Sequence, residues 1–181
     1  MDRKELWNLI IRYFILLILP INGLIIIYGI TRPLTVYPVL WVLSLFYSDA
    51  SLLASDIIDF AGVQAHIIPA CLAGAAYYLL LILNLTTPIA LKKRIKSIIF
   101  MLALFLLVNI GRISLFAHLY VTGYSFFDLT HKITWYLGST VLVVLIWFLT
   151  IKKFKITNIP IYTDFKNIYL DTKKKPNKTK K

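Results

Sequence analysis

The sequence predicts an all-α integral membrane protein, with about four transmembrane helices and one outer interfacial or re-entrant helix. Apolar residues make up 59% of the 181 positions and charged residues only 15%, well below the roughly 25% of soluble domains. Four apolar stretches approach the ~20 residues that a helix needs to cross the hydrocarbon core. Basic residues also gather on one side of these stretches. Lipid is therefore the expected solvent for most of this single domain.

The expected spans are read from apolar runs that lack formal charges or nearly so. They cover residues 9–30, 67–85, 98–121 and 133–151. Residues 34–46 are also apolar, but Pro38 interrupts them and the run is too short for a span. We therefore expect an interfacial or re-entrant helix there. The first span is too long for a secretory signal and lacks a small-residue cleavage site, so we expect a retained helix.

Charge placement sets the expected orientation. With four spans, 17 of the 20 basic residues fall on one side, the exceptions being Arg32, Arg112 and Lys132. Loops rich in Lys and Arg remain in the cytoplasm. Both termini are therefore expected to be cytoplasmic, in a multi-pass protein of the cell membrane. A fifth span over residues 34–46 would break this alternation.

The chain divides into a multi-pass domain, residues 1–155, and a basic cytoplasmic tail, residues 156–181. The last nine or so residues are six lysines with Pro, Asn and Thr, a composition typical of disorder. These lysines are expected to be attracted to anionic lipid headgroups. No aromatic residue is interleaved with them, so no nucleic-acid partner is expected.

An ionisable residue within a membrane helix is costly and is a functional candidate. Arg112 lies inside the apolar stretch 98–121. Asn109 is three residues earlier and shares its helical face. The two polar groups indicate a stripe that faces protein. The alternative is an arginine that snorkels outward to the headgroups.

Cys71 is the only cysteine in the chain. Pro69 suits the first turn of a helix, and a helix N-terminus stabilises a thiolate. The alternative is a small apolar residue without chemistry. Cys71 and Arg112 each lie 14 residues from the inner ends of their expected helices, roughly 21 Å above the cytoplasmic boundary. We therefore expect them to face one another across a cleft open to the outer leaflet.

The chain has three histidines, and the residues alone do not separate them. His131 opens the last span, whereas His66 precedes Cys71 and His118 follows Arg112. On a straight helix His131 would lie about 9 Å above Cys71. His66 and His118 could equally be interfacial histidines without a chemical role.

Three short motifs occur here in a particular order. They are Ala70-Cys71 at a helix start, Asn109-x-x-Arg112-Ile113, and His131 followed by Gly138. At these positions the chain resembles the exosortase/archaeosortase family of membrane cysteine transpeptidases, in particular its small archaeal, pacearchaeosortase-like branch. The resemblance covers roughly residues 33–148. It departs from the family at 72–74, where Leu-Ala-Gly replaces Ser or Thr followed by Gly.

The resemblance implies a cysteine protease/transpeptidase at the outer face of the membrane. Such an enzyme cleaves the C-terminal transmembrane sorting signal of a secreted protein and transfers the product to an amine, expected to be on a lipid. Cys71 would be the nucleophile, Arg112 the oxyanion stabiliser and His131 the acid–base group, with Asn109 in support. The resemblance implies no cofactor and no metal.

Two other functions remain open from the sequence. One is a non-catalytic membrane protein, such as a transporter or channel subunit, in which Arg112 and Asn109 line a polar path. The other is an enzyme that acts on lipid headgroups, which would need a metal or phosphate site. Asp56 and Asp59 are three residues apart but lack the further acidic partners that a metal site needs.

Overall fold

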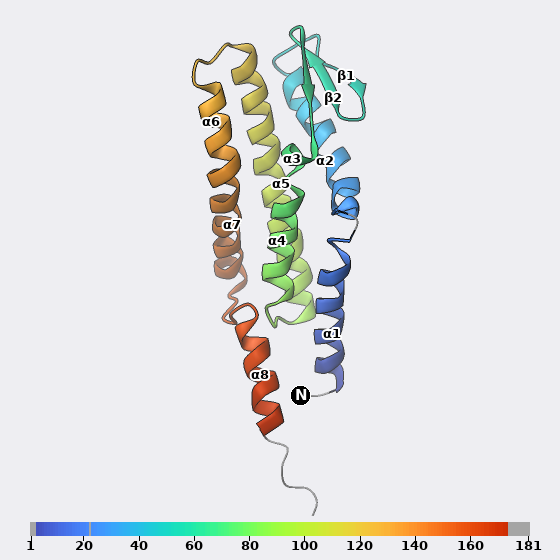
Figure 1. The fold of residues 1–181 in the computed structure, drawn as a ribbon, viewed down its shortest axis with the longest axis vertical. Helices are drawn as coiled ribbons and strands as arrows, with labels where there is room; N and C mark the ends of the chain where they lie inside the picture. The colour runs from blue at the N-terminus through green and yellow to red at the C-terminus, as the bar shows by residue number, and fades with distance from the viewer. Residues whose placement is uncertain (1–2, 22, 174–181) are drawn as a thin grey trace, which may run out of the picture.

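The chain forms an elongated helical bundle with a small β-sheet at one end (Figure 1). A computed structural model describes residues 3–21 and 23–173. Two helices, α1 (Arg3–Ile18) and α2 (Ile25–Ser44), run in the same direction toward the sheet. The sheet consists of β1 (Ser51–Ala54), β2 (Ile57–Phe60) and β3 (Val63–His66).

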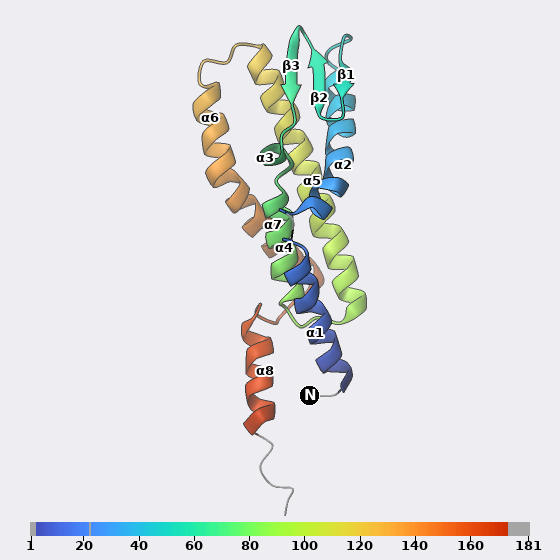
Figure 2. The ribbon, with the colours of Figure 1, turned by 45° about the vertical axis from the view of Figure 1, so that its right-hand side comes forward.

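The rest of the chain runs away from the sheet, returns to it and runs away again (Figures 1 and 2). Its elements are α3 (Pro69–Leu72), α4 (Gly74–Leu85), α5 (Leu91–Val121), α6 (Phe127–Ile133), the π-helix η1 (Thr134–Gly138), α7 (Ser139–Phe154) and α8 (Tyr162–Lys173). Helices α1 and α8 consequently lie at the same end, opposite the sheet. The central helix is α5, which packs against α2, α4 and α7.

Three helical segments of the described chain are long and apolar enough to cross a membrane. They are Ile25–Ser44, Leu91–Val121 and Phe127–Phe154, while Pro69–Leu85 is apolar but shorter. Large apolar side chains such as Trp41, Leu107 and Phe148 are more than 60% exposed on these helices. Exposed apolar surface of this extent indicates a membrane protein.

The expected single helix over residues 9–30 is wrong, because the helix is interrupted between α1 and α2. Pro20 and Gly23 fall in this break, and Gly23 and Leu24 have φ values of +66° and +64°. Proline ends helices and glycine readily adopts positive φ. The sequence analysis missed this interruption, because the residues before and after Pro20 and Gly23 are equally apolar.

The expected interfacial helix over residues 34–46 is also wrong as a separate element. Residues 34–44 form about half of α2, which contains both Pro33 and Pro38. Each proline removes one backbone hydrogen bond, a loss that transmembrane helices tolerate when neighbouring groups compensate. Helices α1 and α2 run in the same direction, so together they replace the single expected first span. The later helices therefore keep the directions that four spans predicted.

The sheet corrects the all-α prediction. Strands β2 and β3 are antiparallel and joined by the two residues Ala61 and Gly62, with φ values of +49° and +72°. A two-residue turn with positive φ at both positions suits the twist of a hairpin. The Asp49 carboxylate accepts a hydrogen bond of 2.7 Å from the Ala61 N–H and holds this turn. The Ala-Gly pair between two short runs was the available signal.

The interior is divided into two apolar clusters. The one under the sheet contains Val36, Val39, Leu43, Ile58, Phe60, Ile67, Leu72 and Ile110. The other, nearer the opposite end, contains Ile27, Tyr77, Leu80, Met101, Phe105, Val143, Ile146 and Trp147. Asn109 is buried beside the first cluster, on the same helix as Ile110. Polar side chains that face the inside while apolar ones face outward are typical of membrane bundles.

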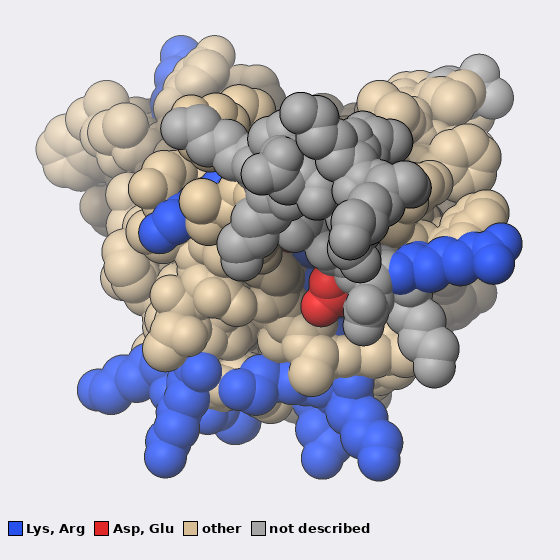
Figure 3. Space-filling model, turned by 90° about the horizontal axis from the view of Figure 1, so that it is seen from below, with Lys and Arg blue, Asp and Glu red and all other residues tan. Residues whose placement is uncertain are grey.

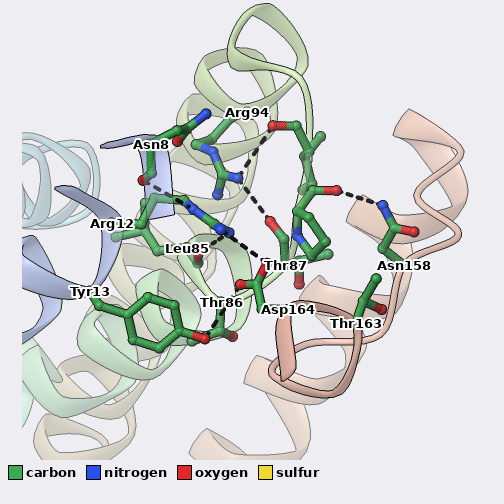
Figure 4. A network of polar contacts seen from close by, with 12 residues as sticks. Asn8, Arg12, Tyr13, Leu85, Thr86, Thr87, Arg94, Asn158, Thr163 and Asp164 are labelled. Carbon is green, nitrogen blue, oxygen red and sulfur yellow. Dashed lines mark hydrogen bonds and ion pairs between the residues drawn. The ribbon is translucent and has the colours of Figure 1, made fainter. Parts of the chain in front are cut away.

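Arginines fasten the end opposite the sheet (Figure 4). The Arg12 guanidinium forms a buried ion pair of 3.0 Å with Asp164 of α8 and donates to the Leu85 carbonyl at 2.9 Å. Arg94 donates to the carbonyls of Asn84, Thr87 and Ile89, at 2.7, 2.8 and 3.3 Å. These bonds tie Arg94 to carbonyl groups at the end of α4 and in the turn between α4 and α5, where buried backbone groups need partners.

Basic side chains surround this same end (Figure 3). The exposed ones on α5, α7 and the residue after it are Lys92, Lys93, Lys96, Lys152, Lys153 and Lys155. Helix α8 occupies residues that the sequence placed in a tail. The disorder expected for the last nine residues falls almost entirely outside the described residues.

Candidate active site

Cys71 lies on a single helical turn and not at the start of a long helix. Helix α3 ends at Leu72, and Ala73 has a left-handed φ of +53° before α4 begins at Gly74. The predicted continuous helix over residues 67–85 is therefore wrong. Pro69 does occupy the first turn, as expected. One turn has only a small dipole, so the helix N-terminus contributes less to a Cys71 thiolate than the sequence suggested.

The Cys71 carbonyl is bound from the neighbouring helix α5. The Asn109 side-chain amide donates to it at 3.0 Å, and the Arg112 guanidinium donates at 3.3 Å. The backbone turn at Ala73 interrupts regular helical bonding here, so a carbonyl at this position needs side-chain donors. The two polar residues of α5 thus face the protein, and Arg112 does not snorkel outward.

The Arg112 guanidinium also contacts α7. Its guanidinium donates to the Ser139 hydroxyl at 3.1 Å, so one side chain joins α5 to both α3 and α7. Sequence reasoning missed Ser139. The available signal was a Ser-Thr pair, at 139 and 140, within an otherwise apolar stretch.

His131 lies at the same cavity as Cys71, between aromatic rings. Its ring is stacked on Phe127, with centroids 5.5 Å apart, and lies edge-on to Phe116 at 5.1 Å. It is exposed, and no hydrogen bond within the described chain reaches its ring. The stacking therefore orients the imidazole and leaves both nitrogens available.

The π-helix η1 explains how His131 and Ser139 face the same way. Residues eight apart on a regular α-helix differ by about 80° around the axis. Helix η1, Thr134–Gly138, lies between the two residues. A π-turn accommodates one extra residue, so the spacing acts like seven residues, which differ by only about 20°.

The cavity has a volume of about 480 Å³, and its lining is mostly apolar with several aromatic rings. Cys71, Arg112 and His131 all line it, together with His66 from β3 and the rings of Phe60, Phe116, Tyr120, Phe127 and Trp135. His118 is not among the lining residues; its Nδ1 is 2.7 Å from the Tyr47 hydroxyl. The structure thus brings two histidines to the cavity where the sequence offered three.

The arrangement contains the groups that nucleophilic acyl transfer requires. Cys71 supplies a thiol, and Arg112 keeps a positive charge and three further N–H groups beyond the two in use. No hydrogen bond joins the Cys71 sulfur to a histidine among the described residues. Such contacts are often longer before substrate binds. In the described part of the chain, no three His, Cys, Asp or Glu residues are grouped to hold a metal.

Comparisons of the chain with models of protein families, with curated proteins and with solved structures find no match.

Arg112→Lys should destabilise the protein. A lysine ammonium is a single point of donation and cannot span both acceptors as the planar guanidinium does. Losing one charge-assisted bond costs about 1.5–3 kcal/mol. The measurement is thermal unfolding in detergent, with Arg32→Lys as control, because Arg32 of α2 makes no hydrogen bond with the described residues. Equal unfolding temperatures for the two variants would contradict the bridging role.

Proposed function

We propose that this protein is a membrane cysteine transpeptidase, of the kind that the exosortase/archaeosortase family comprises. The observation that carries the proposal is the cavity that contains the only cysteine of the chain together with Arg112 and His131. These are the residues that the family resemblance selects. They come from three separate elements, so their common cavity supports a shared role.

In the proposed reaction, the Cys71 thiolate attacks a peptide carbonyl and forms a tetrahedral intermediate. Arg112 stabilises the oxyanion that develops. As the C–N bond breaks, His131 donates a proton to the departing amine, and a thioester remains on Cys71. A second amine then attacks the thioester, gives up a proton to His131 and releases the Cys71 thiolate, which restores the starting state. The product carries a new amide bond.

The bonds of Arg112 suit this role. Its contact with the Cys71 carbonyl fixes the guanidinium beside the nucleophile's own backbone, and Ser139 fixes its plane. A preorganised cation stabilises a transition state without reorganisation at the moment of reaction. Asn109 supports the same carbonyl and acts as a positioning residue.

The proposed substrate is a secreted protein that ends in a transmembrane sorting signal, and the proposed acceptor is a lipid amine. Both would reach the site from within the bilayer. The outer surfaces of α5 and α7 are lined by large apolar side chains, including Leu107, Leu115 and Phe148. These surfaces could receive a substrate helix by lateral diffusion.

In the proposed orientation, the end with α1 and α8 lies in the cytoplasm and the sheet lies outside. The exposed lysines at the first end support this assignment, since basic residues mark the cytoplasmic side. Helices α1 and α2 together make one passage toward the sheet, so the later passages alternate as the charges require. The cavity is then at the outer face, beside the sheet.

A non-catalytic membrane subunit is the competing function. Asn109 and Arg112 both bind the backbone of Cys71, an arrangement that could serve only to fasten a broken helix. In that case the thiol would be dispensable.

Cys71→Ser should abolish processing of sorting signals. The change is nearly isosteric, but a serine without a paired base is a poor nucleophile. Cells that produce each form are compared by mass spectrometry of secreted proteins that end in an apolar segment and basic residues. We expect intact C-terminal peptides with Cys71→Ser and their loss with the native chain and with Ser125→Ala, an exposed loop control. Processing by Cys71→Ser at the native level would favour the non-catalytic function.

His131→Ala should reduce the processing rate by about 10²–10⁴-fold, the usual contribution of an acid–base group. His66→Ala should have a smaller effect, and His118→Ala serves as the control outside the cavity. Rates are compared at equal amounts of each variant in the membrane. Loss of activity in His66→Ala with full activity in His131→Ala would reverse the assignment.

The orientation can be tested with single cysteines placed in the Cys71→Ser background. A membrane-impermeant maleimide applied to intact cells should label Ser125→Cys, in the loop after α5. It should label Lys93→Cys, near the start of α5, only after the cells are opened. The opposite labelling pattern would show that the sheet lies in the cytoplasm and would contradict the proposed orientation.

A further inference from the structure

Strand β3 is an edge strand with one side unpaired. The sheet order is β1-β2-β3, so β3 is bonded to β2 alone. Five residues after its end at His66, the chain reaches Cys71. The strand therefore leads directly into the segment that carries the thiol.

The register identifies the backbone groups that face away from β2. Phe60 and Val63 close the two-residue turn and form a bonded pair. Bonded and non-bonded pairs alternate along an antiparallel ladder, so Ala65 also faces β2, and the bond from the Ile67 N–H to the Asp56 carbonyl continues the pattern. The backbone groups of Gln64 and His66 consequently point outward.

These outward groups are largely unused. The His66 carbonyl accepts from the Ile68 N–H at 3.1 Å. The N–H and carbonyl of Gln64 and the N–H of His66 have no partner among the described residues. Unpaired groups of this kind on a strand edge are a template for another strand.

The cavity follows this edge. Val63, Gln64, Ala65 and His66 all line it. Successive side chains of a strand point to opposite faces, so a cavity on one face would be lined by alternate residues only. Four consecutive residues at one cavity indicate that it runs along the edge, where the backbone is accessible, and that it continues to Cys71.

We propose that the free edge of β3 binds the substrate as an added strand. In this arrangement, which rests on the proposed function, one residue of an extended peptide exchanges two hydrogen bonds with Gln64. The His66 N–H provides a further donor toward Cys71. The scissile carbonyl is thereby brought to the thiol in an extended conformation. The substrate's transmembrane helix must then begin beyond the cleaved bond.

A peptide fits this edge better than a lipid. Donor and acceptor groups at Gln64 call for a partner with both kinds of group at strand spacing, which a peptide backbone provides. The aromatic walls of the cavity would contact the alternate side chains of that strand. A second copy of the chain could pair with the same edge, and the experiment includes that outcome.

The experiment measures alkylation of Cys71 by two chloromethyl ketones in detergent-solubilised protein. One is acetyl-tetra-alanine chloromethyl ketone, whose side chains offer little besides a backbone. The other is chloroacetone, which has no amide to pair with a strand. Mass spectrometry gives each rate, and the rate ratio of peptide to chloroacetone reports strand pairing. Gln64→Pro removes the outward N–H at an edge position where proline is tolerated, and Gln64→Ala keeps that N–H.

Gln64→Pro should lower the rate ratio by about tenfold, the effect of losing one hydrogen bond, while Gln64→Ala leaves it unchanged. Probes with a single N-methylated amide test the native protein directly, so the result does not depend on how well Gln64→Pro folds. Methylation of the residue that pairs with Gln64 should lower the ratio, and methylation of its neighbour should not.

An unchanged ratio in Gln64→Pro and with every methylated probe would overturn strand addition, although Cys71 would remain a nucleophile. A dimer that dissociates on Gln64→Pro with an unchanged ratio would assign the edge to a second copy and also overturn the proposal. If neither reagent alkylates Cys71 in the native protein, the proposed function fails and strand addition fails with it.

Discussion

The site depends on the hydrogen bonds of one guanidinium group. Arg112 donates to the Cys71 carbonyl and to the Ser139 hydroxyl, so it sets the relative positions of α3, α5 and α7. A charge within an apolar bundle is stable only when its donors are satisfied. The broken backbone at Ala73 provides an acceptor for it. Charge and helix break therefore stabilise one another, and the thiol is positioned as a consequence.

At the opposite end of the molecule, two other arginines also bind backbone carbonyls. Arg94 binds three carbonyls in the turn between α4 and α5, and Arg12 binds a fourth at Leu85. In both places an arginine binds backbone carbonyls where a helix ends. Irregular backbone at membrane depth is tolerated only where protein groups satisfy it. Both ends have a cavity, but the one beside Arg112 is lined by a thiol, whereas the one at the other end is lined by the ion pair of Arg12 and Asp164.

The segment between Gln64 and Ala73 combines three structural states within ten residues. An edge strand becomes one helical turn and then a left-handed residue. Each state gives the proposed mechanism something different: unpaired backbone for a peptide, a half-buried position at the cavity for Cys71, and a carbonyl that accepts from Arg112. A continuous helix would bond its own backbone and could provide neither the first nor the last. The departure from the family at residues 72–74 falls at this break, where Ala73 adopts positive φ without being glycine.

The sequence by itself determined that the chain is mostly apolar helix, that lysines gather at one end, and that Cys71 and Arg112 lie near one another. The first two follow from hydropathy and charge along the chain. The third was predicted from helical rise, although the helix expected to carry Cys71 is interrupted at Ala73. Only the tertiary structure decided the break after Ile18, the sheet, the bond to Ser139 and the face on which His131 lies. Apolar runs look alike whether a helix continues through Pro38 or stops near Pro20, because the outcome depends on which neighbours compensate the lost hydrogen bonds. Likewise, the π-turn before Ser139 changes the direction in which the later side chains point, and no local sequence pattern indicates it. The residue that Ser139 then contacts, Arg112, lies 27 residues away.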